Sequence, residues 1–317
     1  MAKRPAHPPE SPLASGDDSD EDMQQYRSSR TPFAKTEPEP TMLRHLLAGA
    51  CLALTAATAA HAKNPDALWH IVHERCVPLQ TGTGSAAPGN ASDSSTGTPP
   101  GKGPCTVLDM PHRIAVLKSI EGRSQYLLIP TDRTPGMEAS SLRDPATPDY
   151  FAHAWTQVSR VGEGYGVRLP RGDVALAINS QDGRSQNQLH IHVECIRPDV
   201  KVALYYMRSA VGTTWTPLPA PLLGHPYRAM RINTPDITGV KPFLLLARSL
   251  RDPEHEMGHH TLAVVPETFS DNTKGFLLLD DVADPARQNR ASAEELQDHS
   301  CAIIGQDPLV TTTAHPR

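Results

Sequence analysis

The sequence lacks an excess of positive charge, and it lacks closely spaced cysteine pairs. Its 317 residues carry a formal net charge of −5 at pH 7, so no basic surface favours a nucleic-acid partner. No two cysteines stand at C-x-x-C spacing, which argues against a structural zinc site. Hydrophobic residues make up 38% and charged residues 21% of the chain, a composition typical of a globular protein with added polar segments.

The first 41 residues lack the aliphatic side chains that a folded core needs, and we expect 1–41 to be a disordered extension. The segment 42–62 differs, because a short basic start at Met42 precedes an apolar stretch that ends in Ala-His-Ala. This pattern predicts a signal peptide, with Met42 as the true start. An uncleaved membrane anchor is the alternative, although the stretch is shorter than the roughly 20 residues that span a bilayer. A buried core helix fits this cleavage pattern worst.

Four cysteines follow this segment, and an even number in an exported protein indicates two disulfides. Cys76 and Cys105 flank a Gly/Ser/Thr/Pro-rich tract, which we expect to be a flexible insert over 80–104. A bridge between them stabilises the fold by roughly 3–4 kcal/mol in the chain-entropy model. Cys195 then pairs with Cys301. The alternative is free thiols in a reducing compartment.

The hydrophobic patterns predict an α+β domain, with helices flanking an antiparallel sheet, over 63–317. Its first part contains, in order, a helix at 66–76, a β-hairpin at 112–130, a helix at 149–166 and a second hairpin from strands at 174–180 and 188–196. The second part contains a helix at 202–210, strands at 241–250, 259–266 and 274–281, and a final helix at 290–299. Ser292 and Glu295 stand at capping-box spacing in that last helix.

Two histidines stand two residues apart in the strand QLHIHVECI. Because side chains alternate along a strand, Gln188, His190 and His192 share one face, and the apolar residues between them share the other. Three interpretations remain open for this face: a solvated surface, part of a metal site, or a site of phosphoryl chemistry in which a neutral imidazole is the nucleophile. The metal site needs a further ligand, and we expect Glu194 on the opposite face.

The turn before this strand favours phosphoryl chemistry. Asn179, Gly183 and Ser185 lie in a polar bend that can present hydrogen-bond donors to phosphate oxygens, and Arg184 adds positive charge. The spacing N-x-x-x-G-x-S-x-x-Q-x-H-x-H over 179–192 resembles the signature of the histidine-triad superfamily. The segments SQYLLIPTDRTPG, LRDPATPDYFAHAW, INSQDGRSQNQLHIHVECIRPDV, LLGHPY and NRASAEELQDHSC resemble one family in particular, the bacterial CDP-diacylglycerol pyrophosphatases.

This resemblance implies roles for individual residues. His190 corresponds to the nucleophilic histidine, and His192 to the last histidine of the motif, which donates to phosphate or to the leaving group. Asn179 and Ser185 correspond to residues that bind the nucleotide or its phosphates. Gln188 stands where the first histidine of the motif is found, and it can form hydrogen bonds but cannot carry a proton. Arg133 stands where many relatives have another histidine, and could hold a phosphate.

The resemblance further implies a HIT-like fold and hydrolysis of CDP-diacylglycerol to CMP and phosphatidate through a cytidylyl-histidine, with no metal or other cofactor. A lipid substrate implies the membrane surface as a partner, and a location at the periplasmic face of the inner membrane or in the periplasm. The aliphatic residues 243–246 could contact acyl chains, although a core strand explains them better. The alternatives are a nucleotide- or lipid-binding protein without catalysis and a secreted metal-dependent phosphoesterase.

Overall fold

The computed structural model describes residues 64–78 and 103–313. The predicted extension 1–41, the signal or anchor segment 42–62 and nearly all of the predicted insert 80–104 lie outside these residues. Within the two described ranges, no helix combines the length and the apolar character that crossing a membrane requires.

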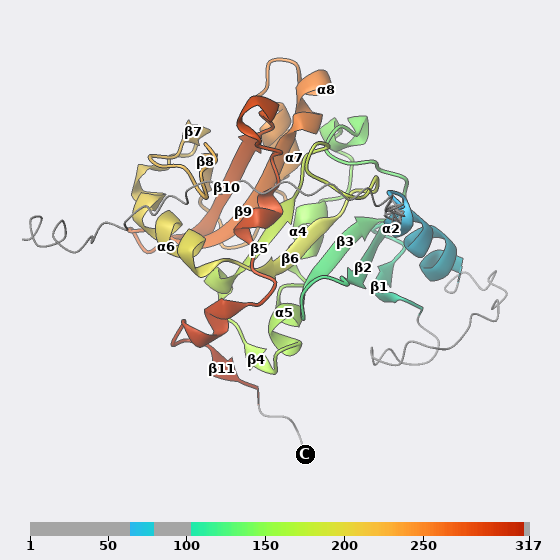
Figure 1. Ribbon diagram of the computed structural model, residues 1–317, viewed down its shortest axis with the longest axis horizontal. Helices are drawn as coiled ribbons and strands as arrows, with labels where there is room; N and C mark the ends of the chain where they lie inside the picture. Colours follow the sequence, from blue (N-terminus) through green and yellow to red (C-terminus); the bar gives the residue numbers. More distant parts are fainter. Residues whose placement is uncertain (1–63, 79–102, 314–317) are drawn as a thin grey trace, which may run out of the picture. The chain divides into compact units, whose positions relative to one another are not determined.

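An antiparallel sheet of nine strands organises the described residues, in the order β1-β2-β3-β6-β5-β9-β10-β8-β7 (Figure 1). The strands are β1 (Cys105–Asp109), β2 (Ile114–Lys118), β3 (Tyr126–Pro130), β5 (Val174–Ile178), β6 (Ile191–Cys195), β7 (Thr216–Pro217), β8 (Arg228–Ile232), β9 (His260–Thr268) and β10 (Lys274–Val282). A separate pair joins β4 (Val167–Arg168) to β11 (Thr311–Thr312). The large antiparallel sheet confirms the predicted α+β class, while the HIT-like fold stays a prediction.

Helices are short and lie on both faces of the sheet. The α-helices are α2 (Ala67–His70), α4 (Tyr150–Trp155), α5 (Ser159–Glu163), α6 (Pro198–Met207), α7 (Pro242–Ala247) and α8 (Pro253–Glu256). α2 continues directly into the π-helix η1 (Ile71–Cys76). The 3-10 turns are η2 (Ser140–Arg143), η3 (Arg171–Asp173), η4 (Arg208–Ala210), η5 (Met257–His259), η6 (Pro285–Arg287), η7 (Ala293–Leu296) and η8 (Ala302–Gly305).

The two faces of the sheet are covered differently. On one face, a single apolar core extends from β2 to β10 beneath α4 and α7, and it includes Leu189, Ile191 and Val193 from the histidine segment. The opposite face carries two separate clusters. One packs α2 and η1 against β1, β2 and β3, and the other packs α6 and η7 against β5, β9 and β10. Strand β6 lies between these two clusters, so its side chains on this face are left for other contacts.

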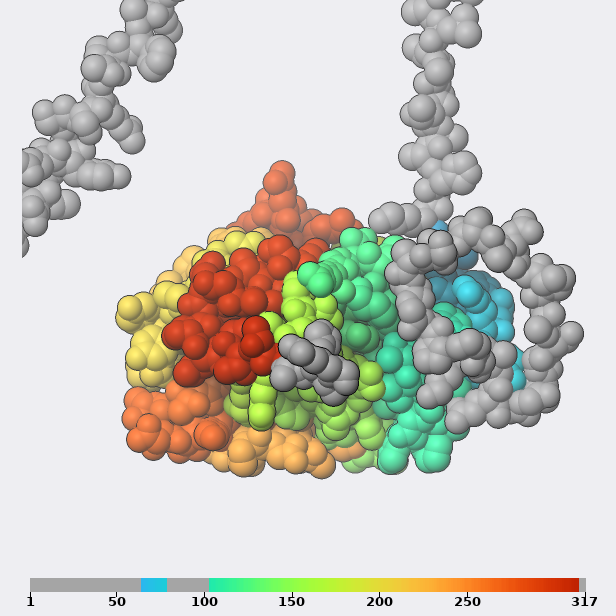
Figure 2. Space-filling view, turned by 90° about the horizontal axis from the view of Figure 1, so that it is seen from below, coloured from blue at the N-terminus to red at the C-terminus, as the bar shows by residue number. Residues whose placement is uncertain are grey.

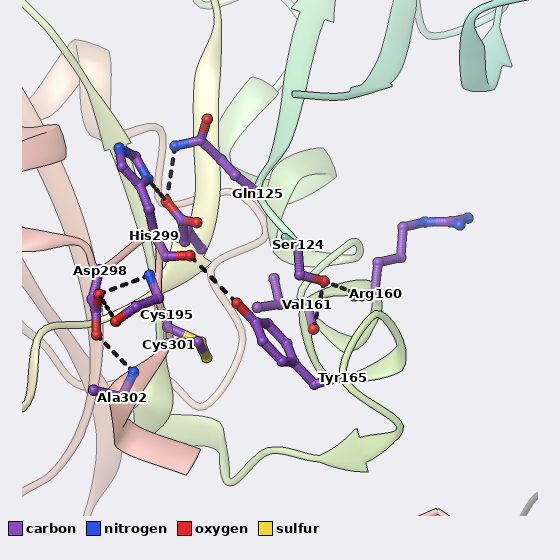
Figure 3. The surroundings of a disulfide bond; sticks show 12 residues. Ser124, Gln125, Arg160, Val161, Tyr165, Cys195, Asp298, His299, Cys301 and Ala302 are labelled. Carbon is purple, nitrogen blue, oxygen red and sulfur yellow. Dashed lines mark hydrogen bonds and ion pairs between the residues drawn. A yellow bond between two sulfur atoms is a disulfide. The ribbon is translucent and has the colours of Figure 1, made fainter. Parts of the chain in front are cut away.

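Both predicted disulfides are present. Cys76 is bonded to Cys105, which ties η1 to β1, and Cys195 is bonded to Cys301, which ties the end of β6 to the C-terminal segment (Figure 3). The Cα atoms are 5.8 Å apart in the first pair and 5.3 Å apart in the second, within the usual range for disulfides. These bonds confirm the predicted pairing.

The predicted hairpin at 112–130 and the paired strands at 174–180 and 188–196 are confirmed as β2–β3 and β5–β6. The strand predicted at 241–250 is wrong, because Pro242 begins helix α7 there after the left-handed residue Lys241. Proline at the first helical position is preorganised for a helix, and a short apolar run alone does not distinguish a helix from a strand.

The helix predicted at 290–299 is also wrong, since only the 3-10 turn η7 forms. The side chain of Ser292 makes no capping hydrogen bond. The chain turns extended at Gln297, which forms a β-bridge with Ile196. The Gln297 side chain also donates to the carbonyl oxygen of Ala175, at 2.7 Å. These contacts with the sheet replace the further turns of helix that the capping pattern predicted.

Candidate active site

His190 and His192 lie at the bottom of a cleft of about 640 Å³ on the face that carries two apolar clusters. One side of the cleft comes from α2, β2 and β3, and the other comes from the turn after β5 and from the C-terminal segment. Figure 2 shows the C-terminal segment (red) beside the yellow-green middle of the chain, with the green strands β1–β3 beyond it. The two histidine side chains are therefore mostly buried, but they line a cleft that is large enough for a small molecule.

His190 is held in one tautomer by the backbone. Its Nδ1 lies 2.7 Å from the carbonyl oxygen of Gln188. Because a carbonyl oxygen only accepts, Nδ1 carries the proton and Nε2 keeps its lone pair. Burial, together with the nearby His192, lowers the pKa of His190 to about 4. The ring is therefore neutral at pH 7, with one nitrogen free to act as a nucleophile.

His192 stacks edge-on against His190, with ring centroids 4.8 Å apart. Its Nδ1 lies 3.1 Å from Oε1 of Glu294, which is close enough for an ion pair but not aligned as a hydrogen bond. Within the described ranges, neither ring nitrogen of this buried side chain has a hydrogen-bond partner. Buried polar atoms are rarely left in this state, and the Glu294 carboxylate is the charged group beside this ring.

Glu294 is fixed by two amide side chains. Asn179 donates from Nδ2 to one carboxylate oxygen at 3.0 Å, and its own Oδ1 accepts from the Glu294 backbone N–H at 3.1 Å. Gln125 donates to the other oxygen at 3.1 Å. Burial alone would raise the pKa of Glu294, but His192 and the two amides together hold it well below its ordinary value. Glu294 is therefore ionised beside His192 at neutral pH.

Glu194 lies on the same face as the histidines, so its expected place on the opposite face is wrong. Its position follows from the alternation that runs through β6 and the residue before it, in which residues 190, 192 and 194 share one side. The carboxylate accepts from Gln125 at 2.9 Å and lies 2.7 Å from Nδ1 of His299. In Figure 3, Gln125 and His299 lie above the Cys195–Cys301 disulfide.

The Glu194–His299 pair affects both partners. Burial raises the pKa of Glu194, although His299 opposes the effect. Burial alone would lower the pKa of His299, but the Glu194 carboxylate raises it. Gln125 joins this pair to Glu294, so a chain of polar contacts runs from His299 at the side of the cleft to His192.

The turn after β5 borders the cleft through Gly183 and Ser185. Ser185 is exposed, and its hydroxyl has no hydrogen-bond partner in the described part of the chain, which leaves it available to a ligand. The N–H of Gly183 is already used by the backbone and side chain of Ser180. A Cβ at position 183 would lie 2.9 Å from the carbonyl oxygen of Arg290, so glycine lets this turn pack against the C-terminal segment.

Three residues singled out in the sequence have their side chains engaged away from the cleft. Gln188 donates to the carbonyl oxygens of Pro130 and Asp132, and so fastens the loop after β3 rather than facing a substrate. Arg133 pairs with Asp66 at 2.5 Å and lies over the Trp69 ring. Both contacts attach α2 to that loop. Arg184 is held by both carboxylate oxygens of Glu138.

Several cleft residues were not assigned a role from the sequence: Lys118, Gln125, Glu294 and His299. Lys118 donates to the carbonyl oxygens of Ser119 and Gly122, and burial lowers its pKa. Glu294 and His299 lie in NRASAEELQDHSC, one of the segments that resemble the family. The resemblance of this polar segment to an enzyme family could have indicated that it contains site residues. Among the described residues, no cluster of three His, Cys, Asp or Glu side chains is arranged to hold a metal ion.

Comparison with known proteins identifies one family. A family model described as CDP-diacylglycerol pyrophosphatase matches residues 63–305. A curated CDP-diacylglycerol pyrophosphatase from Yersinia pestis is 39% identical over 246 residues, which cover 78% of this chain and 88% of the relative. The matched region contains all the cleft residues described above.

Proposed function

The chain belongs to the CDP-diacylglycerol pyrophosphatase family, and from that premise we propose that His190 carries the hydrolysis of CDP-diacylglycerol through a cytidylyl-histidine intermediate. The enzyme cleaves the pyrophosphate bridge of its lipid substrate. The proposal assigns the covalent step to one imidazole and places the polar side of the cleft around the nucleotide-side phosphorus. Membership of the histidine-triad superfamily remains part of the proposal, supported by the motif over 179–192.

In the first step, Nε2 of His190 attacks the phosphorus that bears cytidine. The P–N bond forms as the bond to the bridging oxygen breaks, and phosphatidate leaves with that electron pair. His192 donates a hydrogen bond or a proton to the departing oxygen. In the second step, water attacks the same phosphorus and passes a proton back to His192, the P–N bond breaks with its electron pair returning to Nε2 of His190, and CMP is released.

The observation that carries this proposal is the hydrogen bond from Nδ1 of His190 to the Gln188 carbonyl oxygen. It places the only available lone pair of the ring on Nε2, and the low pKa keeps that lone pair free at neutral pH. A nucleophile needs both conditions.

Glu294 supports the role of His192. Its carboxylate, 3.1 Å from Nδ1, stabilises the positive charge that His192 carries when it acts as a donor. Ser185 and Lys118, which line the same cleft, are suited to stabilise the phosphate oxygens as negative charge develops. Asn179 contributes indirectly, because its side chain is committed to Glu294.

A lipid substrate fits an enzyme held at a membrane surface, so we propose that the chain is exported and works at the periplasmic face of the inner membrane. The support is the apolar segment within 42–62 with its Ala-His-Ala ending. Fractionation of cells that express the full chain, followed by protease treatment of spheroplasts, tests this. A chain protected inside spheroplasts would contradict the proposed location.

Hydrolysis in ¹⁸O-labelled water tests the site of attack. We expect the heavy oxygen in CMP and none in phosphatidate, because water enters at the nucleotide-side phosphorus. His190→Ala should abolish CMP release, whereas His255→Ala, which alters an exposed histidine on α8, should not change it. Label in phosphatidate, or full activity of His190→Ala, would overturn the proposal.

A further inference from the structure

One wall of the cleft is aliphatic and continues to the protein surface. Leu68 and Ile71 from the helical segment face the same space as Leu117 and Leu127 from the β2–β3 hairpin. At the rim, in the turn between these strands, Ile120 is 96% exposed. An aliphatic path therefore leads from open solvent to the histidines.

This wall is firmly built. Leu68, Leu117 and Leu127 are each less than a tenth exposed, because they belong to the cluster that packs the helical segment on β1–β3. The Cys76–Cys105 disulfide ties the end of that segment to the edge strand β1. Ile120 differs from these three residues, because its side chain is exposed and adds almost no buried apolar surface to the folded state. An exposed aliphatic side chain at the mouth of an apolar cleft indicates a ligand or a surface that covers it.

We propose that this wall binds the diacylglycerol part of the substrate, with Ile120 contacting the first acyl carbons where the lipid enters from the bilayer. This inference rests on the proposed function and adds to it a specificity-determining residue. The substrate has an anionic nucleotide end and an apolar end. The cleft matches this division, with its polar groups around Asn179 and Glu294 and its aliphatic groups around Ile120.

The competing occupant of the wall is the cytosine ring. Proteins commonly hold bases by stacking them on aromatic side chains. Among the described residues that line the cleft there is no Phe, Tyr or Trp, so the wall offers branched aliphatic contacts instead. A base also has no need of an aliphatic residue projecting into solvent, whereas a lipid drawn from a bilayer does. The aliphatic segment 243–246, which the sequence offered for acyl contact, lies mostly in the core beneath the opposite face.

Ile120→Asn tests the proposal, because the site is exposed and the change adds no charge. The control is Leu309→Asn, since Leu309 is 72% exposed and lies outside this cleft. Two quantities are measured for each variant: the KM for CDP-diacylglycerol in mixed micelles and the inhibition constant of CMP. We expect Ile120→Asn to raise the KM on the order of tenfold, the loss of one buried aliphatic contact, with the CMP inhibition constant within twofold. Ile120→Leu keeps an aliphatic side chain, so its KM should equal that of the unaltered protein.

A KM that does not change in Ile120→Asn overturns the inference. An equal rise in the KM and in the CMP inhibition constant also overturns it, because the wall would then bind the nucleotide. An equal rise of the KM in Leu309→Asn would show a general surface effect and contradict the assignment to Ile120. Failure of the proposed function looks different, since the unaltered protein would then release no CMP from the lipid.

Discussion

Replacing Glu294 with glutamine removes a negative charge beside His192, and it also replaces one of the two oxygens that accept from Asn179 and Gln125 with an amide NH2 group. Oε1 of Glu294 lies 3.1 Å from Nδ1 of His192. At an effective dielectric constant of about 20, two unit charges at that distance attract by roughly 5 kcal/mol. The Glu294 side chain is 24% exposed, so water screens part of this attraction, and an amide keeps a favourable dipole toward the ring. About 3 kcal/mol lost from the transition state corresponds to roughly a 10²-fold lower rate.

The assay is kcat/KM for CMP release at pH 7, with the melting temperature measured in parallel to verify folding. Glu163→Gln is the matched control, because it removes one carboxylate on α5 that is not part of the cleft lining. We expect Glu294→Gln to lose about two orders of magnitude in kcat/KM, most of it in kcat, and the control to keep full activity. A Glu294→Gln enzyme within twofold of the unaltered protein, with normal stability, would refute the assignment of Glu294.

Two further predictions concern pH and the turn after β5. Because burial and His192 lower the pKa of His190 to about 4, this histidine stays neutral above that pH, and its protonation should reduce kcat/KM only near pH 4. A midpoint near pH 6.5 for the His190 ring in an NMR titration of the unaltered protein would contradict this. Gly183→Ala should destabilise the fold by about 1–3 kcal/mol in denaturant unfolding, since its Cβ would meet the carbonyl oxygen of Arg290 at 2.9 Å. Gly305→Ala, with open space around its Cβ, is the control, and equal stability of both variants would refute the packing argument.

The central strands could be read from the sequence because their signal is local. In β6 and the residue before it, alternation correctly placed His190 and His192 together and put Ile191 into the core. The same alternation places Glu194 on the face of the histidines. The expectation that it lies on the opposite face was therefore an error in counting along the strand. The disulfides were also predictable, because only four cysteines follow residue 62 and they can pair in few ways.

Glu294 could not be found from local pattern. It lies 115 residues after Asn179, in a 3-10 turn that has no periodicity, and reaches His192 only because the C-terminal segment crosses the sheet. The role of Gln188 was equally hidden. Its spacing places it in the histidine motif, but the loop at 130–134 approaches from another part of the chain and takes up its hydrogen bonds. Contacts between distant segments decide such roles, and one sequence does not encode them as a pattern.

Rapid chemical quenching of the enzyme during turnover of CDP-diacylglycerol labelled in the cytidine moiety tests the covalent step most directly. The prediction is an acid-labile, alkali-stable label on the peptide that contains His190, formed and lost fast enough to account for CMP release and absent from His190→Ala. Steady CMP release by the unaltered protein, with no labelled protein at any quench time, would contradict a cytidylyl-histidine.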